Sequence, residues 1–172
     1  MLKNKVIAVD ICNTLADVIS ELNARLGVSP TPDVYFHPGI KDRDYFKKNL
    51  DVFLDAKVLG NSNLVISELA KYNKIVYITA RPKESELVTR IWLKKNGFPK
   101  GELHFTNDKP SIASKLGVDM AFEDAPHEID NYRNNTNVEV LVKKQPYNLG
   151  YENLFDWCDF SFVEQVQADK KN

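Results

Sequence analysis

Polar residues of the kinds that carry phosphate chemistry stand at the ends of several apolar runs in this 172-residue sequence. Asp10 follows one short hydrophobic run, Thr79 closes a second, and Glu123 with Asp124 closes another. Lys109 stands in the segment after a further run. A carboxylate in such a place can act as a nucleophile or metal ligand, a hydroxyl can donate to a phosphoryl oxygen, and a lysine can neutralise charge. These residue types predict a site for a phosphorylated ligand.

The acidic members of this set predict a magnesium site. Mg²⁺ takes a few oxygen ligands and keeps water or substrate phosphate oxygens in its remaining positions. Asp10 and Asp124, with a backbone carbonyl, suit that preference. Without a cation or a lysine nearby, such clustered carboxylates would repel each other. We therefore expect Mg²⁺ as the cofactor.

The hydrophobic pattern predicts the elements that position these residues. Apolar, β-rich runs predict buried parallel strands over 5–10, 74–79, 102–105, 118–123 and 138–142. Helical spacing predicts helices from Leu15 to Gly27, over 62–72, from Leu87 to Gly97 and from Pro110 to Gly117. In the third of these, the apolar face contains Leu87, Val88, Ile91 and Trp92, and Trp92 is expected in the core. Strand and helix alternate, which predicts an α/β fold with a doubly wound, Rossmann-like parallel sheet.

The segment 28–60 breaks this alternation. It carries three prolines and many charges, a predicted helix around 45–56, and the aromatic residues Tyr35, Phe36, Tyr45, Phe46 and Phe53. We interpret it as a small cap insertion after the first strand-helix unit, with 1–27 and 61–172 forming the core. Because ligands of open α/β sheets bind beyond the carboxyl ends of the strands, the insertion is placed to act as a lid. We interpret its aromatic residues as the packed core of the lid in preference to groups that stack on a base.

Composition limits the partners and the compartment. The 23 basic and 24 acidic residues give a net charge of −1, so we expect neither a nucleic acid polymer nor an anionic membrane as partner. Cys12 and Cys158 belong to no Cys/His cluster, and the three histidines show no metal spacing. The sequence has no apolar run of membrane-spanning length, which predicts a cytoplasmic protein. A frayed end is expected over 169–172, and the oligomeric state is left open.

Four motifs carry a family resemblance. The stretches DICNTLADV from Asp10, YITARP from Tyr77, TNDKP from Thr106 and FEDAPHEI from Phe122 resemble the haloacid dehalogenase superfamily. Within it, they resemble the 5'(3')-deoxyribonucleotidases and related nucleotidases. The resemblance covers about residues 5 to 142. It implies a Mg²⁺-dependent phosphohydrolase that acts on a nucleotide or small phosphomonoester through an aspartyl-phosphate.

The resemblance also implies residue roles. Asp10 would be the nucleophile and a metal ligand, together with the Cys12 backbone carbonyl and the Asp124 carboxylate. Glu123 matches the other member of the acidic pair.

The substrate side of the implied site comes from two further motifs. Thr79 and Lys109 would contact the phosphoryl group, with Ala80 and Arg81 beside them. For Arg81, a structural salt bridge is an equally good interpretation. Taken alone, Thr79 is also an ordinary strand former and Lys109 an ordinary solvated lysine.

One departure from the family pattern keeps alternatives open. Cys12 stands where family phosphatases carry an aspartate that protonates the leaving group, and a thiol with a pKa near 8.5 does not replace it. One alternative is therefore a relative that binds nucleotide or phosphate without turnover. Another is a hydrolase of the superfamily that cleaves a different bond. A receiver domain of the response-regulator type fits poorly, because its acidic pair would stand on the first strand.

Overall fold

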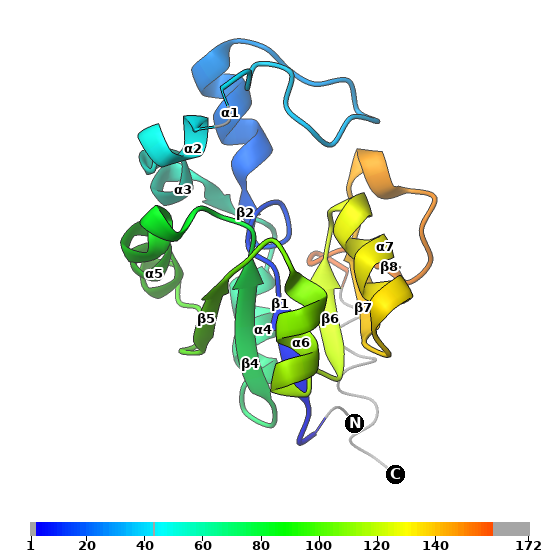
Figure 1. The fold of residues 1–172 in the computed structure, drawn as a ribbon. Helices are drawn as coiled ribbons and strands as arrows, with labels where there is room; N and C mark the ends of the chain where they lie inside the picture. The colour runs from blue at the N-terminus through cyan, green and yellow to red at the C-terminus, as the bar shows by residue number, and fades with distance from the viewer. Residues whose placement is uncertain (1–2, 43, 160–172) are drawn as a thin grey trace.

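The central feature is a parallel β-sheet, seen in a computed structural model that describes residues 3–42 and 44–159. Within these residues the sheet has six strands in the order β5-β4-β1-β6-β7-β8 (Figure 1). The strands are β1 (Val6–Val9), β4 (Lys74–Thr79), β5 (Glu102–Phe105), β6 (Met120–Glu123), β7 (Glu139–Lys143) and β8 (Leu154–Phe155). The predicted α/β fold is confirmed, and β8 is a strand that the pattern does not predict.

Helices cover both faces of the sheet. The side chains of β1 alternate, so that Ile7 and Val9 join one buried cluster and Ala8 joins the other. The first cluster contains residues of α1 (Val18–Leu26), α4 (Ser62–Leu69) and α5 (Glu86–Lys95), and the second contains residues of α6 (Lys109–Leu116) and α7 (Pro126–Asn135). The predicted stops at Gly27 and Gly117 are confirmed, since both have φ near +60°, which favours glycine. The predicted helix start at Leu15 is wrong, because α1 begins only at Val18.

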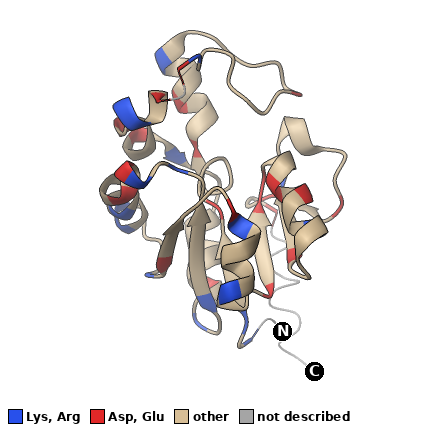
Figure 2. Cartoon of the chain, viewed as in Figure 1, with Lys and Arg blue, Asp and Glu red and all other residues tan. Residues whose placement is uncertain are grey.

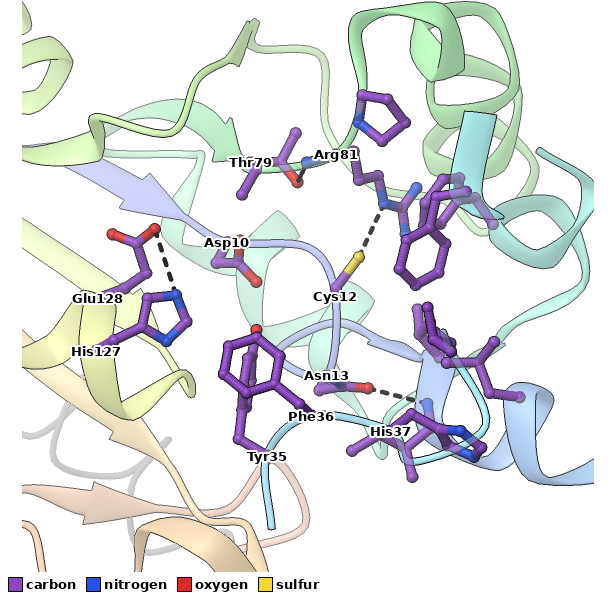
Figure 3. Close-up of a pocket in the computed structure, with 18 of the residues that line it drawn as sticks. Asp10, Cys12, Asn13, Tyr35, Phe36, His37, Thr79, Arg81, His127 and Glu128 are labelled. Atoms are coloured by element: carbon purple, nitrogen blue, oxygen red, sulfur yellow. Dashed lines mark hydrogen bonds and ion pairs between the residues drawn. The ribbon is translucent and has the colours of Figure 1, made fainter. Parts of the chain in front are cut away.

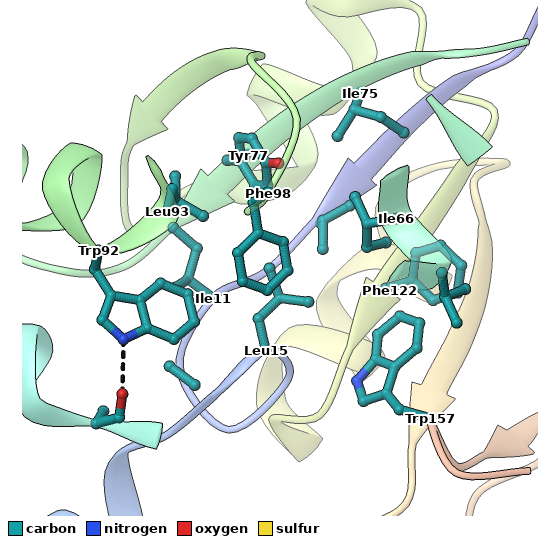
Figure 4. Close-up of a cluster of buried hydrophobic side chains, with 14 of the residues drawn as sticks. Ile11, Leu15, Ile66, Ile75, Tyr77, Trp92, Leu93, Phe98, Phe122 and Trp157 are labelled. Carbon is teal, nitrogen blue, oxygen red and sulfur yellow. Dashed lines mark hydrogen bonds between the residues drawn. The ribbon is translucent and has the colours of Figure 1, made fainter. Parts of the chain in front are cut away.

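The expected core tryptophan is confirmed. Trp92 has 0% exposure, and its indole Nε1 donates to the carbonyl of Ala56 at 2.7 Å (Figure 4). The apolar face predicted for this helix is wrong in part, because Leu87 and Ile91 are exposed. Thr89 takes a buried position instead, and its hydroxyl accepts a hydrogen bond from Nη1 of Arg81. The buried face of α5 therefore combines the polar Thr89 with Trp92 and Leu93.

The segment 28–60 starts after α1 and returns beside it. Its last strand, β3 (Lys57–Val58), pairs antiparallel with β2 (Ala16–Asp17), and Leu59 N donates to the Leu15 carbonyl at 2.8 Å. The segment therefore joins the core at both ends, next to the residues that follow β1.

The prediction of one helix over 45–56 is wrong. Two short helices occur there, α2 (Tyr45–Lys48) and α3 (Asp51–Asp55). Between them, Asn49 leaves the helical region with φ −129° and ψ 58°, and its side-chain amide donates to the Tyr45 carbonyl at 2.8 Å. A local side-chain bond of this kind competes with helix continuation.

Charge is distributed over the helices rather than concentrated by sign. Acidic and basic residues are interspersed, and α5 carries both (Figure 2). Among the described residues, no helix is long and apolar enough to cross a membrane. The predicted frayed end at 169–172 lies outside the described residues.

Candidate active site

The polar residues singled out at the strand ends converge at one edge of the sheet. Asp10 follows β1, Thr79 ends β4, and Asp124 follows β6, while Lys109 begins α6. The order β4-β1-β6 places Asp10 between the other two strand ends. All four side chains are buried. Their convergence follows from the parallel sheet, whose strands all end at the same edge.

Lys109 ties two carboxylates together. Its Nζ lies 2.7 Å from Oδ1 of Asp10 and 2.7 Å from Oε2 of Glu123. Burial opposes the lysine charge, but the two carboxylates outweigh burial and hold the pKa of Lys109 well above its ordinary value. The ammonium therefore stays charged beside Asp10. The N-cap Asp108, which accepts from Ser111 N at 3.2 Å, fixes the helix start that presents this lysine.

The two members of the acidic pair have different partners. Besides Lys109, Glu123 accepts from the backbone N–H groups of Asp124 and Ala125, each at 3.1 Å. The Asp124 carboxylate accepts from the Thr14 hydroxyl at 2.7 Å and the Tyr147 hydroxyl at 2.5 Å. Burial raises the pKa of Tyr147, and the adjacent carboxylate raises it further, so the phenol keeps the proton that it donates.

Three carboxylates of this edge can share one cation. Asp10, Glu123 and Asp124 each offer an oxygen, and these oxygens lie within 4.8 Å of one another. Burial raises the pKa of Glu123 and of Asp124, and the negative charge of Asp10 acts in the same direction. Three carboxylates surround the single Lys109 ammonium, and a divalent cation would balance the remaining negative charge. The donor set, made only of oxygen, fits Mg²⁺.

The loop after β1 is held from the far end of the chain. Asn13 adopts φ +57°, a conformation that asparagine tolerates better than most residues. Its carbonyl accepts from Nε2 of Gln145 at 2.7 Å, and the Thr14 carbonyl accepts from Nε1 of Trp157 at 2.6 Å. These bonds fix the turn that carries Asp10 and Cys12.

A pocket of about 250 Å³ opens over this edge. Asp10, Cys12, Thr79 and Lys109 contribute to its lining together with Ala80 and Arg81, and residues of the 28–60 segment line its other side (Figure 3). Asp124 is not among the lining residues, since Thr14 and Tyr147 cover its carboxylate.

Arg81 does not form the structural salt bridge that the sequence offered as one interpretation. No carboxylate of the described residues forms an ion pair with it. Its Nε donates to Sγ of Cys12 at 3.1 Å, its Nη1 donates to Thr89, and its guanidinium lies 4.3 Å from the centre of the Phe53 ring. The guanidinium is therefore held in one orientation at the pocket wall.

The aromatic residues of the 28–60 segment divide into two groups. Phe53 is buried as expected for lid core, but Phe36 is 72% exposed, which contradicts a core role for it. Phe36 stacks on His127 of α7, with ring centroids 5.9 Å apart. Tyr35 contacts Tyr147 edge to face, with centroids 5.3 Å apart. The segment thus touches the opposite side of the pocket.

Comparison with known families adds to this geometry. A family model described as "5' nucleotidase, deoxy (Pyrimidine), cytosolic type C protein" matches residues 33–167, which is most of the chain. The chain belongs to this family. The resemblance to nucleotidases of the haloacid dehalogenase superfamily is confirmed, and the family match includes Thr79, Lys109 and the acidic pair.

One curated relative agrees with this assignment, and two solved structures share the fold. The chain is 36% identical over 96 residues to "Putative nucleotidase OB0422" of Oceanobacillus iheyensis, a match covering 51% of this chain and only 50% of that protein. The fold is similar to that of the haloacid dehalogenase-like hydrolase SP0104 from Streptococcus pneumoniae, with TM-score 0.61, 13% identity, and 97% and 100% of the two chains covered. L-2-Haloacid dehalogenase PA0810 aligns with TM-score 0.62, 11% identity and coverage of 96% and 99%.

Sequence reasoning missed three contributors to this candidate site. Thr14 stands inside the first motif but received no role, although it donates to Asp124. Glu128, in the last motif, lines the pocket and is buried. Tyr147 carries no recognisable signal, because it follows β7 in a turn that only the tertiary structure places beside Asp124.

Proposed function

We propose that the protein is a Mg²⁺-dependent phosphohydrolase that acts on a nucleotide or another small phosphomonoester through an aspartyl-phosphate on Asp10. The observation that carries this proposal is the position of Asp10, which lines the pocket with its Oδ1 2.7 Å from the Lys109 ammonium. Membership of the nucleotidase family supports the substrate class.

The chain's own residues account for the first chemical step. With Oδ1 held by Lys109, the other carboxylate oxygen of Asp10 attacks phosphorus, and the bond from phosphorus to the leaving oxygen breaks. Lys109 and the Thr79 hydroxyl compensate the negative charge on the phosphoryl oxygens. Ala80 and Arg81 line the wall next to this group. Water then attacks the phosphorus of the aspartyl-phosphate, which releases phosphate and restores Asp10.

A magnesium ion fits the acidic cluster. Asp10, Asp124 and the Cys12 backbone carbonyl would hold it, and it would supply charge neutralisation at the phosphate. Glu123 serves mainly to hold Lys109, since its oxygens already contact that ammonium and two backbone N–H groups.

The domain division belongs to the same proposal. Residues 28–60 form a cap over a core made of 1–27 and 61–172, and the cap closes the pocket over the substrate. The contacts of Tyr35 with Tyr147 and of Phe36 with His127 support this role, because they bridge the cap and the opposite wall. A closed pocket excludes water from the attack on phosphorus. Small phosphorylated molecules, rather than polymers, suit a pocket of this size.

A second candidate is a nucleotide-binding relative without turnover. Cys12 favours it, because its side chain lines the pocket but cannot serve as a carboxylic acid during departure of the leaving group. The same residue also favours a hydrolase of the superfamily that cleaves a different bond.

A panel of phosphate esters tests the proposal. Release of phosphate from nucleoside monophosphates and simple esters is measured with Mg²⁺ and with EDTA, for the unaltered chain, for Asp10→Asn and for the exposed control Asp130→Asn. We expect Mg²⁺-dependent release that Asp10→Asn reduces by more than about a thousandfold and the control leaves intact. Circular dichroism verifies that the variants are folded. Nucleotide retention in equilibrium dialysis without phosphate release from any ester would instead establish the binding candidate.

A further inference from the structure

The guanidinium of Arg81, a residue that lines the pocket, has an incompletely satisfied edge. Arg81 is 4% exposed, and its Nη2 has no hydrogen-bond partner within the described residues. In a guanidinium, Nε–H and Nη2–H lie on one edge, where they suit the two oxygens of one carboxylate or phosphate. Here the Nε donor meets only the sulfur of Cys12, a weak acceptor, at 3.1 Å (Figure 3).

The charge of Arg81 is also uncompensated. Lys109 has Asp10 and Glu123 at 2.7 Å, whereas no carboxylate lies within ion-pair distance of Arg81 in the described part of the chain. A buried charge without a partner is costly, and natural proteins usually pair it. Thr89 and the Phe53 ring hold the guanidinium in place but carry no charge. Within the described residues, this position is therefore open to an anion that binds in the pocket.

We propose that Arg81 recognises a second anionic group on the substrate, a carboxylate or a phosphate carried by the leaving group, which is the part of the molecule released when Asp10 attacks phosphorus. This inference rests on the proposed function for its first anion and deepens it by naming a substrate class with two anionic groups. Arg81, Cys12, Asp10 and Lys109 all line one pocket, so one small molecule can reach both positions.

Cys12 controls access to this edge. Its side chain covers the Nε donor, and the position of its sulfur depends on the single torsion χ1. Rotation about χ1 therefore uncovers the edge for an incoming oxyanion. An aspartate at position 12 would occupy the same edge from within the protein. A carboxylate at position 12 and an anionic group of the substrate would therefore compete for the same donors of Arg81.

Calorimetric titration with small phosphonates tests the proposal without requiring turnover. The probes are 3-phosphonopropionate, ethane-1,2-diphosphonate and propylphosphonate, titrated into the full chain at one fixed Mg²⁺ concentration. We expect one or both of the doubly anionic probes to bind roughly ten- to hundredfold more tightly than propylphosphonate, as a charged, two-point hydrogen bond provides. Preference for the first probe identifies a carboxylate as the second group, and preference for the second probe identifies a phosphate.

Variants assign the preference to Arg81. Arg81→Met is expected to bring the ratio of affinities close to one, and Arg81→Lys to reduce it, since lysine keeps the charge without the paired donors. The exposed Arg90→Met is the matched control and should keep the ratio. Replacing Arg81 by a neutral residue also removes a buried unpaired charge, so folding is expected to survive.

Cys12 provides the decisive pair of substitutions. Cys12→Ala uncovers the edge and should keep or raise the ratio, whereas Cys12→Asp fills it and should lower the ratio toward one. Equal binding of all three probes to the unaltered chain, no binding of any probe, or an unchanged ratio in Arg81→Met would overturn the inference. Ester hydrolysis with no charge preference would contradict only this inference, while an Arg81-dependent preference without hydrolysis of any ester would contradict only the proposed function.

Discussion

The Cys12 sulfur lies 3.1 Å from Nε of Arg81, at the place from which a carboxylate would accept both donors on that edge of the guanidinium. This contact connects the one departure from the family motif with an arginine of another motif, 69 residues further along the chain. It also affects what an aspartate introduced at position 12 would do.

Cys12→Asp is expected to raise kcat on an alkyl phosphate by about tenfold. General acid-base catalysis supplies a hundredfold or more in favourable cases, but Arg81 would favour the ionised form of the new carboxyl and reduce the fraction that carries a proton to donate. The increase should be much smaller on an aryl phosphate, whose leaving group departs without a proton. The measurement is kcat at saturating Mg²⁺ and substrate for both esters. An equal or lower kcat on the alkyl ester in a folded variant would rule out a missing acid.

Tyr147→Phe is expected to weaken Mg²⁺ binding by roughly tenfold. The hydroxyl of Tyr147 donates to Oδ2 of Asp124 at 2.5 Å, and loss of such a support for a metal ligand typically costs ten- to hundredfold in affinity. Calorimetric titration with Mg²⁺ measures the change. Tyr151→Phe, which removes a hydroxyl that contacts Asp130 instead, is the control. The role of Tyr147 is wrong if both variants bind Mg²⁺ as the unaltered chain does.

Phe36→Ala is expected to change substrate preference rather than chemistry. Phe36 is exposed and lines the pocket, whereas Tyr45 packs against the core and is expected to affect only stability. Because stacking of a base on an aromatic ring contributes about 1–3 kcal/mol, kcat/KM for a nucleotide should fall roughly tenfold relative to that for a simple alkyl phosphate. Leu87→Ala, an exposed apolar residue outside the pocket, should leave this ratio unchanged. A parallel loss on both substrates would assign Phe36 to packing.

Asp119→Asn is expected to lower thermal stability near neutral pH but not in acid. Asp119 accepts from Nζ of Lys5 and from the backbone N–H of Val6, each at 2.8 Å. The hydrogen bond from Lys5 is the larger cause, and the one from Val6 the smaller, of a pKa of Asp119 below its ordinary value. A lowered folded-state pKa contributes stability above the unfolded-state pKa of about 3.9, and this contribution disappears as pH falls through the lower folded-state pKa. The Tm difference between the two proteins should therefore narrow below about pH 4. A Tm difference that is constant from pH 7 to pH 3 would contradict this.

The positions of the candidate site residues at the strand ends were accessible from local pattern. Apolar runs such as 74–79 predicted strands, and Asp10, Thr79 and Asp124 stand where those strands end. A parallel sheet brings all such ends to one edge whatever the details of packing, so the convergence of these residues with Lys109 needed no knowledge of long-range contacts. The stop of α6 at Gly117 was equally local, because it depends on a single left-handed residue.

The partners of those residues were decided by tertiary structure. Arg81 meets Cys12 instead of a carboxylate, and Tyr147 reaches Asp124 from a turn after β7. Thr89 is buried on α5, where its hydroxyl accepts from the Arg81 guanidinium, whereas Leu87 is exposed. Each of these contacts joins segments that are distant in sequence or depends on which helix face the sheet covers. Hydrophobic periodicity records the neighbours within one element, and it carries no information about a hydrogen-bond partner on another.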